Sequence, residues 1–216
     1  MNDRPSSPSE SSPRTAWLRR LGGWTVARLS NLHWVDERLA RSAQLYGRHT
    51  ALILELYGFR TVINLRGENP EAGWYSAEAE ACRALGVVFL DVPINSRRIP
   101  RRAELQALLQ AFDALEAPAL IKCAGGADRT GLACFLYLID REGPERFAAA
   151  QRHLTAWPYL HIPKLQQRWL RLFLVYWQSH RGPEMPLRRW LDEIYDPQDF
   201  ADWLNAQGKR GTYRNV

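Results

Sequence analysis

The sequence predicts an α/β domain whose central sheet has four or five mainly parallel strands and is flanked by helices. Three observations lead to this fold class. Short runs of β-branched and apolar residues alternate with stretches of helical periodicity. The intervening stretches are long enough to cross from one parallel strand to the next. After residue 142 only helical periodicity remains, which predicts a helical C-terminal part.

The length and composition predict one folded domain with a short additional segment. The chain has 216 residues, of which 46% are hydrophobic and 24% charged, a globular composition that excludes wholesale disorder. Residues 1–14 are rich in Ser and Pro, and we expect a disordered tail there. The predicted single domain, 15–216, comprises an N-terminal helix at 15–30, an α/β core at 31–142 and the helical part at 143–216.

The elements follow in order along the chain. After the amphipathic helix at 15–30, residues 33–35 and 39–42 are predicted to be short edge strands. Glycine can adopt the left-handed conformation that ends a helix, so Gly58 and Gly86 mark two helix ends. The other predicted core elements are a helix at 48–57, a buried strand at 61–65, a helix at 74–85, a buried strand at 87–93, a helix at 101–116, a strand at 119–122 and a helix at 130–141. Proline residues separate the helices predicted at 145–155, 164–179 and 187–205.

The charge balance favours anionic partners. The net charge is +6 and the calculated isoelectric point is about 9.5, and arginine supplies almost all of the excess. No nucleic-acid-binding motif is visible, so we expect no nucleic-acid partner. No apolar stretch approaches the roughly 20 residues of a spanning helix, and no signal peptide is evident, so we expect a cytoplasmic protein. The helix at 15–30 is expected to pack on the domain, with association with an acidic membrane surface as the less favoured alternative.

Three cysteines are too few and too far apart for a disulfide framework or a zinc cluster, so we expect no metal and no cofactor. One of them, Cys123, stands where a buried strand ends and a loop leads into a helix. Arg129 follows after five intervening residues. The backbone N–H groups of such a loop, at 124–129, can point inward and bind an anion, and the helix N-terminus adds further donors.

This loop predicts covalent chemistry on a phosphate ester. Arg129 can hold two phosphate oxygens with its planar fork of donors. The positive surroundings favour the thiolate of Cys123, which is the nucleophilic form, so we expect a phosphocysteine intermediate. The hydroxyl of Thr130 could hydrogen-bond the sulfur and help it to leave. Cys82 and Cys134 lie on predicted helices and are interpreted as core thiols.

The segment KCAGGADRTG resembles the signature loop of the cysteine-dependent tyrosine and dual-specificity phosphatases, Cys-x-x-Gly-x-x-Arg-Thr/Ser-Gly. The matching residues are Cys123, Gly126, Arg129, Thr130 and Gly131. Weaker similarity to the bacterial dual-specificity-like branch is found in RSAQ (41–44), TVINLRGENP (61–70) and VPI (92–94). The resemblance implies the three-layer fold of these phosphatases, protein tyrosine or dual-specificity phosphatase activity, and phosphate contacts from Ala124, Gly125, Gly126, Ala127, Asp128 and Arg129.

Two positions depart from this family pattern. Lys122 precedes the cysteine where the family usually has histidine. The loop after the strand at 87–93 lacks the aspartate that usually protonates the leaving group. Asp128 is our preferred general acid, because some relatives use an aspartate at this position and because a bound phosphate dianion favours the protonated form of a neighbouring carboxyl. Asp91 is the alternative acid, and it also remains open that neither residue serves.

Arg66, Arg97 and Arg98 are candidate substrate contacts. The alternative for Arg66 is a surface salt bridge, and the alternative for Arg97 and Arg98 is plain solvation. His161 is interpreted as a structural residue. The substrate could be a phosphorylated protein, lipid or small molecule, although Ala127 stands where phosphoinositide phosphatases of the family often have lysine. A catalytically weak phosphate-binding module is a further alternative, and sulfur transfer is the least favoured one.

Overall fold

The computed structural model describes residues 13–182 and 184–214. The predicted tail at 1–14 therefore lies outside the described residues, except for its last two residues, which begin helix α1 (Pro13–Leu29). As expected, α1 packs on the domain: Ala27 is buried in a core shared with helix α2 (Arg48–Tyr57). No helix in this part of the chain is long and apolar enough to cross a membrane.

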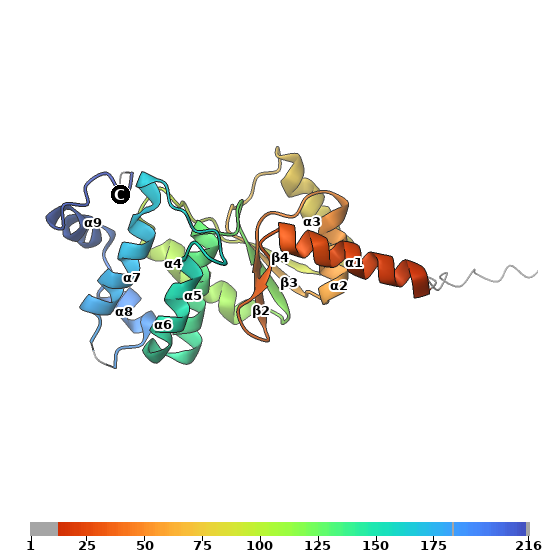
Figure 1. Ribbon diagram of the computed structural model, residues 1–216. Helices are drawn as coiled ribbons and strands as arrows, with labels where there is room; N and C mark the ends of the chain where they lie inside the picture. Colours follow the sequence, from red (N-terminus) through yellow and green to blue (C-terminus); the bar gives the residue numbers. More distant parts are fainter. Residues whose placement is uncertain (1–12, 183, 215–216) are drawn as a thin grey trace, which may run out of the picture.

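The described strands form a five-stranded sheet in the order β1-β2-β5-β3-β4 (Figure 1). Only β1 and β2 pair in the antiparallel sense, so the sheet is mainly parallel, as predicted. The strands are β1 (His33–Trp34), β2 (Leu39–Ser42), β3 (Thr61–Asn64), β4 (Val88–Asp91) and β5 (Ala119–Lys122).

Two predictions about strand position are wrong. β2 is not an edge strand, because β1 covers one side and β5 the other, and all four of its residues are buried. Its polar residues Arg41 and Ser42 are compatible with this position because both find hydrogen-bond acceptors in the interior. β4 was expected to be buried and is instead the outer strand, with Val88 37% exposed. Apolar composition alone does not distinguish a central strand from an edge strand that is covered on one side.

The core helices begin and end close to their predicted positions. They are α2, α3 (Gly73–Leu85), α4 (Arg102–Ala114) and α5 (Asp128–Glu142). Gly58 and Gly86 adopt φ values of 64° and 66°, which confirms them as helix ends.

The C-terminal part consists of helices, as predicted, but they are shorter. The helix expected at 145–155 and the start of that at 164–179 break into short segments, and the helix expected at 187–205 divides at Asp196, whose carboxylate caps a new helix that begins with Pro197. The elements are η1 (Pro144–Arg146), α6 (Phe147–Ala150), η2 (Gln151–Leu154), η3 (Leu165–Gln167), α7 (Trp169–His180), α8 (Leu187–Glu193) and α9 (Pro197–Ala206).

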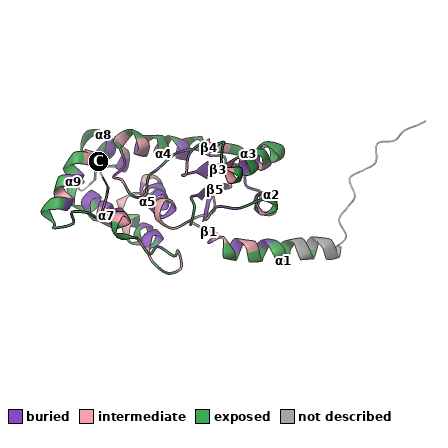
Figure 2. Ribbon diagram, turned by 90° about the horizontal axis from the view of Figure 1, so that it is seen from above, coloured by how far each residue is buried: buried purple, intermediate pink, exposed green. Residues whose placement is uncertain are grey.

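Side chains that alternate along each strand enter two different cores, because successive residues of a strand point to opposite faces of the sheet. Leu120 belongs to the core under α1, α2 and α3, whereas its neighbour Ile121 belongs to the core under α4 and α5. The aromatic side chains of α7, α8 and α9 extend this second core. Figure 2 colours the buried residues along the ribbon in purple. The result is a layer of helices on each side of the sheet, as the predicted fold class requires.

Candidate active site

Cys123 follows the last residue of β5 and lies at an open cavity of about 730 Å³. Its side chain is buried, with 3% of the residue exposed, yet it contributes to the wall of the cavity. The cavity is therefore where a reacting group can reach the sulfur. The residues of the signature loop that line it are Cys123, Ala124, Gly125, Ala127, Asp128 and Arg129.

Three successive carbonyl groups of this loop are turned toward the protein. The backbone N–H of Gln44 donates to the Ala124 carbonyl at 3.1 Å. The side-chain amide of Asn31 donates to the carbonyls of Gly125 at 3.4 Å and Gly126 at 3.2 Å. In a trans peptide group the C=O and the following N–H point in opposite directions. The N–H groups that follow these carbonyls are thus directed to the inside of the loop, which is the arrangement that binds an anion.

Arg41 strengthens this arrangement from below the loop. It is fully buried and donates to the Gly126 carbonyl at 2.5 Å and to the His153 carbonyl at 3.0 Å. Burial, followed by the charge of Arg41, lowers the pKa of His153 to about 3, so the imidazole is neutral and its Nδ1 can accept from Arg41 at 2.9 Å. The Arg41 guanidinium also lies 4.2 Å from the ring centre of Tyr159. Sequence reasoning gave no function to Arg41 or Asn31.

Only one of the two loop glycines is required by its surroundings. Gly126 has φ = 63°, and a Cβ there would lie 2.5–2.7 Å from backbone atoms of Ser42 and Ala43. Gly125 has an ordinary φ, and a Cβ there would meet no atom within 4 Å. The turn of the loop therefore requires glycine at position 126 and not at position 125.

This difference gives a matched pair of variants. Gly126→Ala is expected to destabilise the fold by at least about 2 kcal/mol, because left-handed backbone strain adds to overlap with immobile backbone atoms. That corresponds to a fall in Tm of roughly 4–8 °C for a domain of this size. Gly125→Ala is expected to change stability by less than about 0.5 kcal/mol. Thermal unfolding of both variants measures the difference, and equal Tm values would contradict this account of the loop.

Arg129 and Asp128 stand at the start of α5 and both line the cavity. Arg129 donates to the Leu65 carbonyl at 3.3 Å through one nitrogen, which leaves the rest of the fork for a ligand. The Asp128 carboxylate accepts from Gln167 Nε2 at 3.0 Å, and its other oxygen lies 2.9 Å from Nδ1 of the buried His161. The angles at this second contact do not make a hydrogen bond.

Thr130 lies one residue further along α5. Its hydroxyl is buried and has no hydrogen-bond partner among the described residues. The predicted bond from this hydroxyl to the sulfur of Cys123 is accordingly not formed in this structure.

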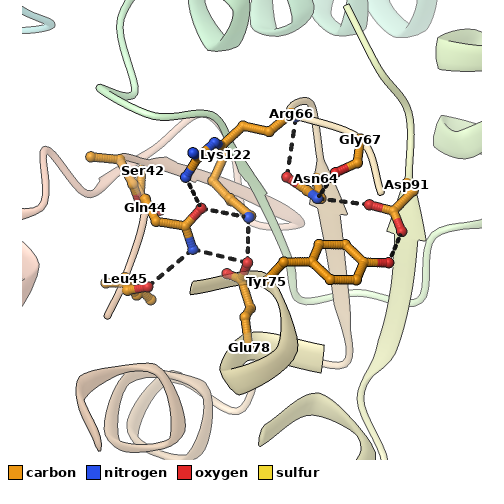
Figure 3. A network of polar contacts seen from close by, with 11 residues as sticks. Ser42, Gln44, Leu45, Asn64, Arg66, Gly67, Tyr75, Glu78, Asp91 and Lys122 are labelled. Carbon is orange, nitrogen blue, oxygen red and sulfur yellow. Dashed lines mark hydrogen bonds and ion pairs between the residues drawn. The ribbon is translucent and has the colours of Figure 1, made fainter. Parts of the chain in front are cut away.

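Lys122 is directed away from the cavity into a buried polar network (Figure 3). Its ammonium group pairs with Glu78 of α3 and donates to Gln44 Oε1 at 3.0 Å. Burial lowers the pKa of Lys122, although the charge of Glu78 acts to raise it. Where the family usually has histidine, this chain therefore has an ion pair that links β5 to α3, and the charge of Lys122 is directed to Glu78.

The same network positions Arg66. Its Nη1 donates to Gln44 Oε1 at 2.9 Å, and its guanidinium lies 3.3 Å from the ring centre of Trp74. Arg66 also lines the cavity, together with Arg97 and Arg98. The structure thus brings all three candidate contact arginines to the cavity that contains Cys123. Sequence reasoning missed a fourth, Arg214, which reaches the cavity from the far end of the chain.

Asp91, the alternative acid, is not among the residues that line this cavity. One carboxylate oxygen accepts from Asn64 at 2.7 Å and the other from the Tyr75 hydroxyl at 2.6 Å (Figure 3). That hydrogen bond raises the pKa of Tyr75 to about 12. Both carboxylate oxygens of Asp91 therefore accept hydrogen bonds at the sheet edge, outside the cavity.

The loop after β4 has no carboxylate and is held by the C-terminal part. Trp169 Nε1 donates to the Ser96 carbonyl at 2.9 Å. The Tyr195 hydroxyl donates to the Pro100 carbonyl at 2.6 Å, and the backbone N–H of Arg214 donates to the Arg97 carbonyl at 2.6 Å. These bonds fix the wall of the cavity opposite the signature loop.

The other cysteines do not approach the cavity, and all three thiols are free. Burial raises the pKa of Cys82 to about 12 and that of Cys134 to about 11. Both are thus protonated and poorly nucleophilic at neutral pH, as their interpretation as core thiols requires.

Comparison with known proteins identifies the shared domain. The family model described as "Swiss Army Knife protein, DSP-PTPase phosphatase domain" matches residues 30–165, more than half of the chain. No curated protein sequence matches. Among solved structures, Tk-PTP in its active form superposes with a TM-score of 0.53 and 20% identity, covering 70% of this chain and 98% of that one. A protein of Shewanella putrefaciens CN-32 superposes with a TM-score of 0.53 and 17% sequence identity, covering 70% of this chain and 97% of that one.

The structural matches confirm the fold, because they span nearly the whole of both solved proteins. The family match covers the sheet, the signature loop and α5. It also confirms the resemblance that the signature residues indicated. The chain therefore belongs to the Swiss Army Knife family of DSP-PTPase phosphatase domains, and the protein is a phosphatase.

Proposed function

We propose that this phosphatase hydrolyses phosphate monoesters through a covalent phosphocysteine at Cys123. The observation that supports this most strongly is the position of the Cys123 thiol. It lies at the cavity wall, inside a loop whose outward-turned carbonyls direct N–H groups inward, and Arg129 lines the same cavity. The donors and Arg129 would hold three phosphate oxygens and leave the phosphorus open to the sulfur.

Two side chains, Cys123 and Asp128, carry out the proposed reaction. The thiolate of Cys123 attacks phosphorus, so that an S–P bond forms while the P–O bond to the leaving group breaks. The departing oxygen takes a proton from Asp128. Water then attacks the phosphocysteine and gives a proton back to Asp128, the S–P bond breaks, and the products are inorganic phosphate and the thiolate.

Asp128 is the proposed acid because it is the only aspartate among the residues that line the cavity. The hydrogen bond from Gln167 keeps its carboxyl at the cavity wall. Glu104, the other carboxylate there, is already paired with Arg98 and accepts the backbone N–H of Arg101. A catalytically weak binding module is less well supported, since nucleophile, arginine and acid all meet at one cavity.

The proposal is tested by measuring phosphate release from 4-nitrophenyl phosphate in the presence of EDTA. A rapid acid quench followed by peptide mass spectrometry should find the phosphoryl group on Cys123. Activity that EDTA abolishes, or a phosphoryl group on a different residue, would contradict the proposed chemistry.

A further inference from the structure

A second, smaller cavity of about 270 Å³ adjoins the active site. Arg97, Gln167 and Arg214 line both cavities, so the two spaces adjoin at these three residues. Lys164 and Gln166 complete the polar part of the smaller cavity, and none of its lining residues carries a carboxylate. The small cavity is therefore a cationic extension of the catalytic one.

The charges in this extension are uncompensated within the described part of the chain. Arg98 has Glu104 as its ion-pair partner, but neither Arg97 nor Arg214 has a carboxylate within salt-bridge distance among the described residues. Arg214 Nε donates to a neutral acceptor, Gln166 Oε1, at 2.6 Å. A cleft lined by cations without counter-charges concentrates anionic ligands. The signature loop and Arg129 already suffice for one phosphate, so these cations are available to a second anionic group.

Backbone contacts hold the two arginines in place although 117 positions separate them in the sequence. The N–H of Arg214 donates to the Arg97 carbonyl at 2.6 Å, and Arg98 and Arg214 form a β-bridge. Gln167 donates to both Ser96 and Asp128, which ties the loop, the smaller cavity and the signature loop together. The pair is therefore preorganised before a ligand arrives.

Arg214 lies outside the segment 30–165 that matches the family. The second cationic cavity is thus formed jointly by the shared domain, which supplies Arg97 and Lys164, and by the C-terminal part of this chain.

We propose that Arg97, Lys164 and Arg214 form a second anion-binding subsite, and that the substrate is a small phosphate ester with a second phosphate-like group. This inference rests on the proposed function, in that the first phosphate is the one attacked by Cys123. A cavity of about 730 Å³ has the size of a small-molecule site. A guanidinium binds a phosphate-like group with two parallel hydrogen bonds, which an uncharged end of a ligand could not form.

The subsite is tested by binding, independently of turnover. Calorimetry on the Cys123→Ser protein would compare alkane-α,ω-bisphosphonates, from ethane to hexane, with alkyl monophosphonates of the same chain length. At the best length the bisphosphonate is expected to bind about tenfold or more tightly, because its second group adds charge-assisted hydrogen bonds that the monophosphonate cannot make. When Arg214→Gln is added to the Cys123→Ser protein, the ratio of bisphosphonate to monophosphonate affinity should fall to about two. A factor of two is the statistical advantage of a ligand with two equivalent ends.

Arg210→Gln is the matched control. It removes the same charge from the same exposed segment, at a residue that lines neither cavity, and it should keep the ratio. Bisphosphonates that bind no more tightly than monophosphonates at every length, or a ratio that survives Arg214→Gln, would overturn the subsite while leaving the proposed chemistry intact. Conversely, tight bisphosphonate binding by a protein that cannot hydrolyse phosphate esters would support the subsite and contradict the proposed function.

Discussion

Replacing Cys123 by serine is expected to abolish phosphate release while the protein still binds orthophosphate. A serine hydroxyl is far less acidic than a thiol, and among the described residues no base is hydrogen-bonded to the side chain at position 123, so covalent attack fails. Loss of a catalytic nucleophile can cost about 10⁶ in kcat. Anion binding persists because the inward N–H groups and Arg129 do not depend on the sulfur. Colorimetric phosphate release and calorimetry with orthophosphate measure the two properties separately.

Cys82→Ser is the matched control for this experiment. Cys82 is as buried as Cys123 but lies in the core on the opposite side of the sheet, under α1, α2 and α3. The same chemical change there should preserve turnover when activity is assayed well below the Tm of the variant. If Cys123→Ser retained the activity of the Cys82→Ser protein, a mechanism through Cys123 would be excluded.

The signature loop could be recognised from the sequence because its parts are contiguous. A strand, a cysteine, an arginine and a helix start occupy 14 successive positions, 119–132, and each follows from a local pattern. The division into two cores also follows from a local pattern. Side chains that alternate along a strand point to opposite faces of the sheet, so the strand sequence decides which core each side chain enters.

The support of the loop was not predictable, because it comes from distant segments. Asn31 and Arg41 hold carbonyls that lie 85 or more positions away, and nothing in their local sequence distinguishes them from exposed polar residues. The mistaken edge position of β2 has the same origin, since the burial of Arg41 is explained by distant partners, namely Gly126 of the signature loop and His153. Arg214 could not be assigned either, because its approach to Arg97 depends on the path of the whole C-terminal part.

The C-terminal part contributes to the candidate active site as well as to the core. Gln167 contacts the proposed acid, Trp169 and Tyr195 hold the loop after β4, and Arg214 lines the cavity. With that loop held and without a carboxylate, a proton donor must come from another wall of the cavity.

Asp128→Asn is expected to slow the hydrolysis of poor leaving groups far more than that of good ones. An alkoxide or phenoxide must be protonated as it departs, whereas 4-nitrophenolate is stable enough to leave without a proton. General acid catalysis contributes typically 10²–10⁴-fold, so kcat/KM for phenyl phosphate should fall by about that factor. The corresponding loss for 4-nitrophenyl phosphate should be less than about tenfold. Asparagine keeps an oxygen that can accept from Gln167, so the change removes the acid and preserves the contact.

Asp91→Asn is the control that separates the two aspartates. Asp91 accepts from Asn64 and Tyr75 outside the cavity, so its replacement should lower kcat/KM for both substrates by the same small factor. If Asp91→Asn selectively lowered kcat/KM for phenyl phosphate, Asp91 at the sheet edge would be the general acid. Equal losses for both substrates in Asp128→Asn would mean that neither carboxyl protonates the leaving group, and that water or the substrate itself supplies the proton. The ratio of the two kcat/KM values in each variant therefore decides among the three alternatives that the sequence left open.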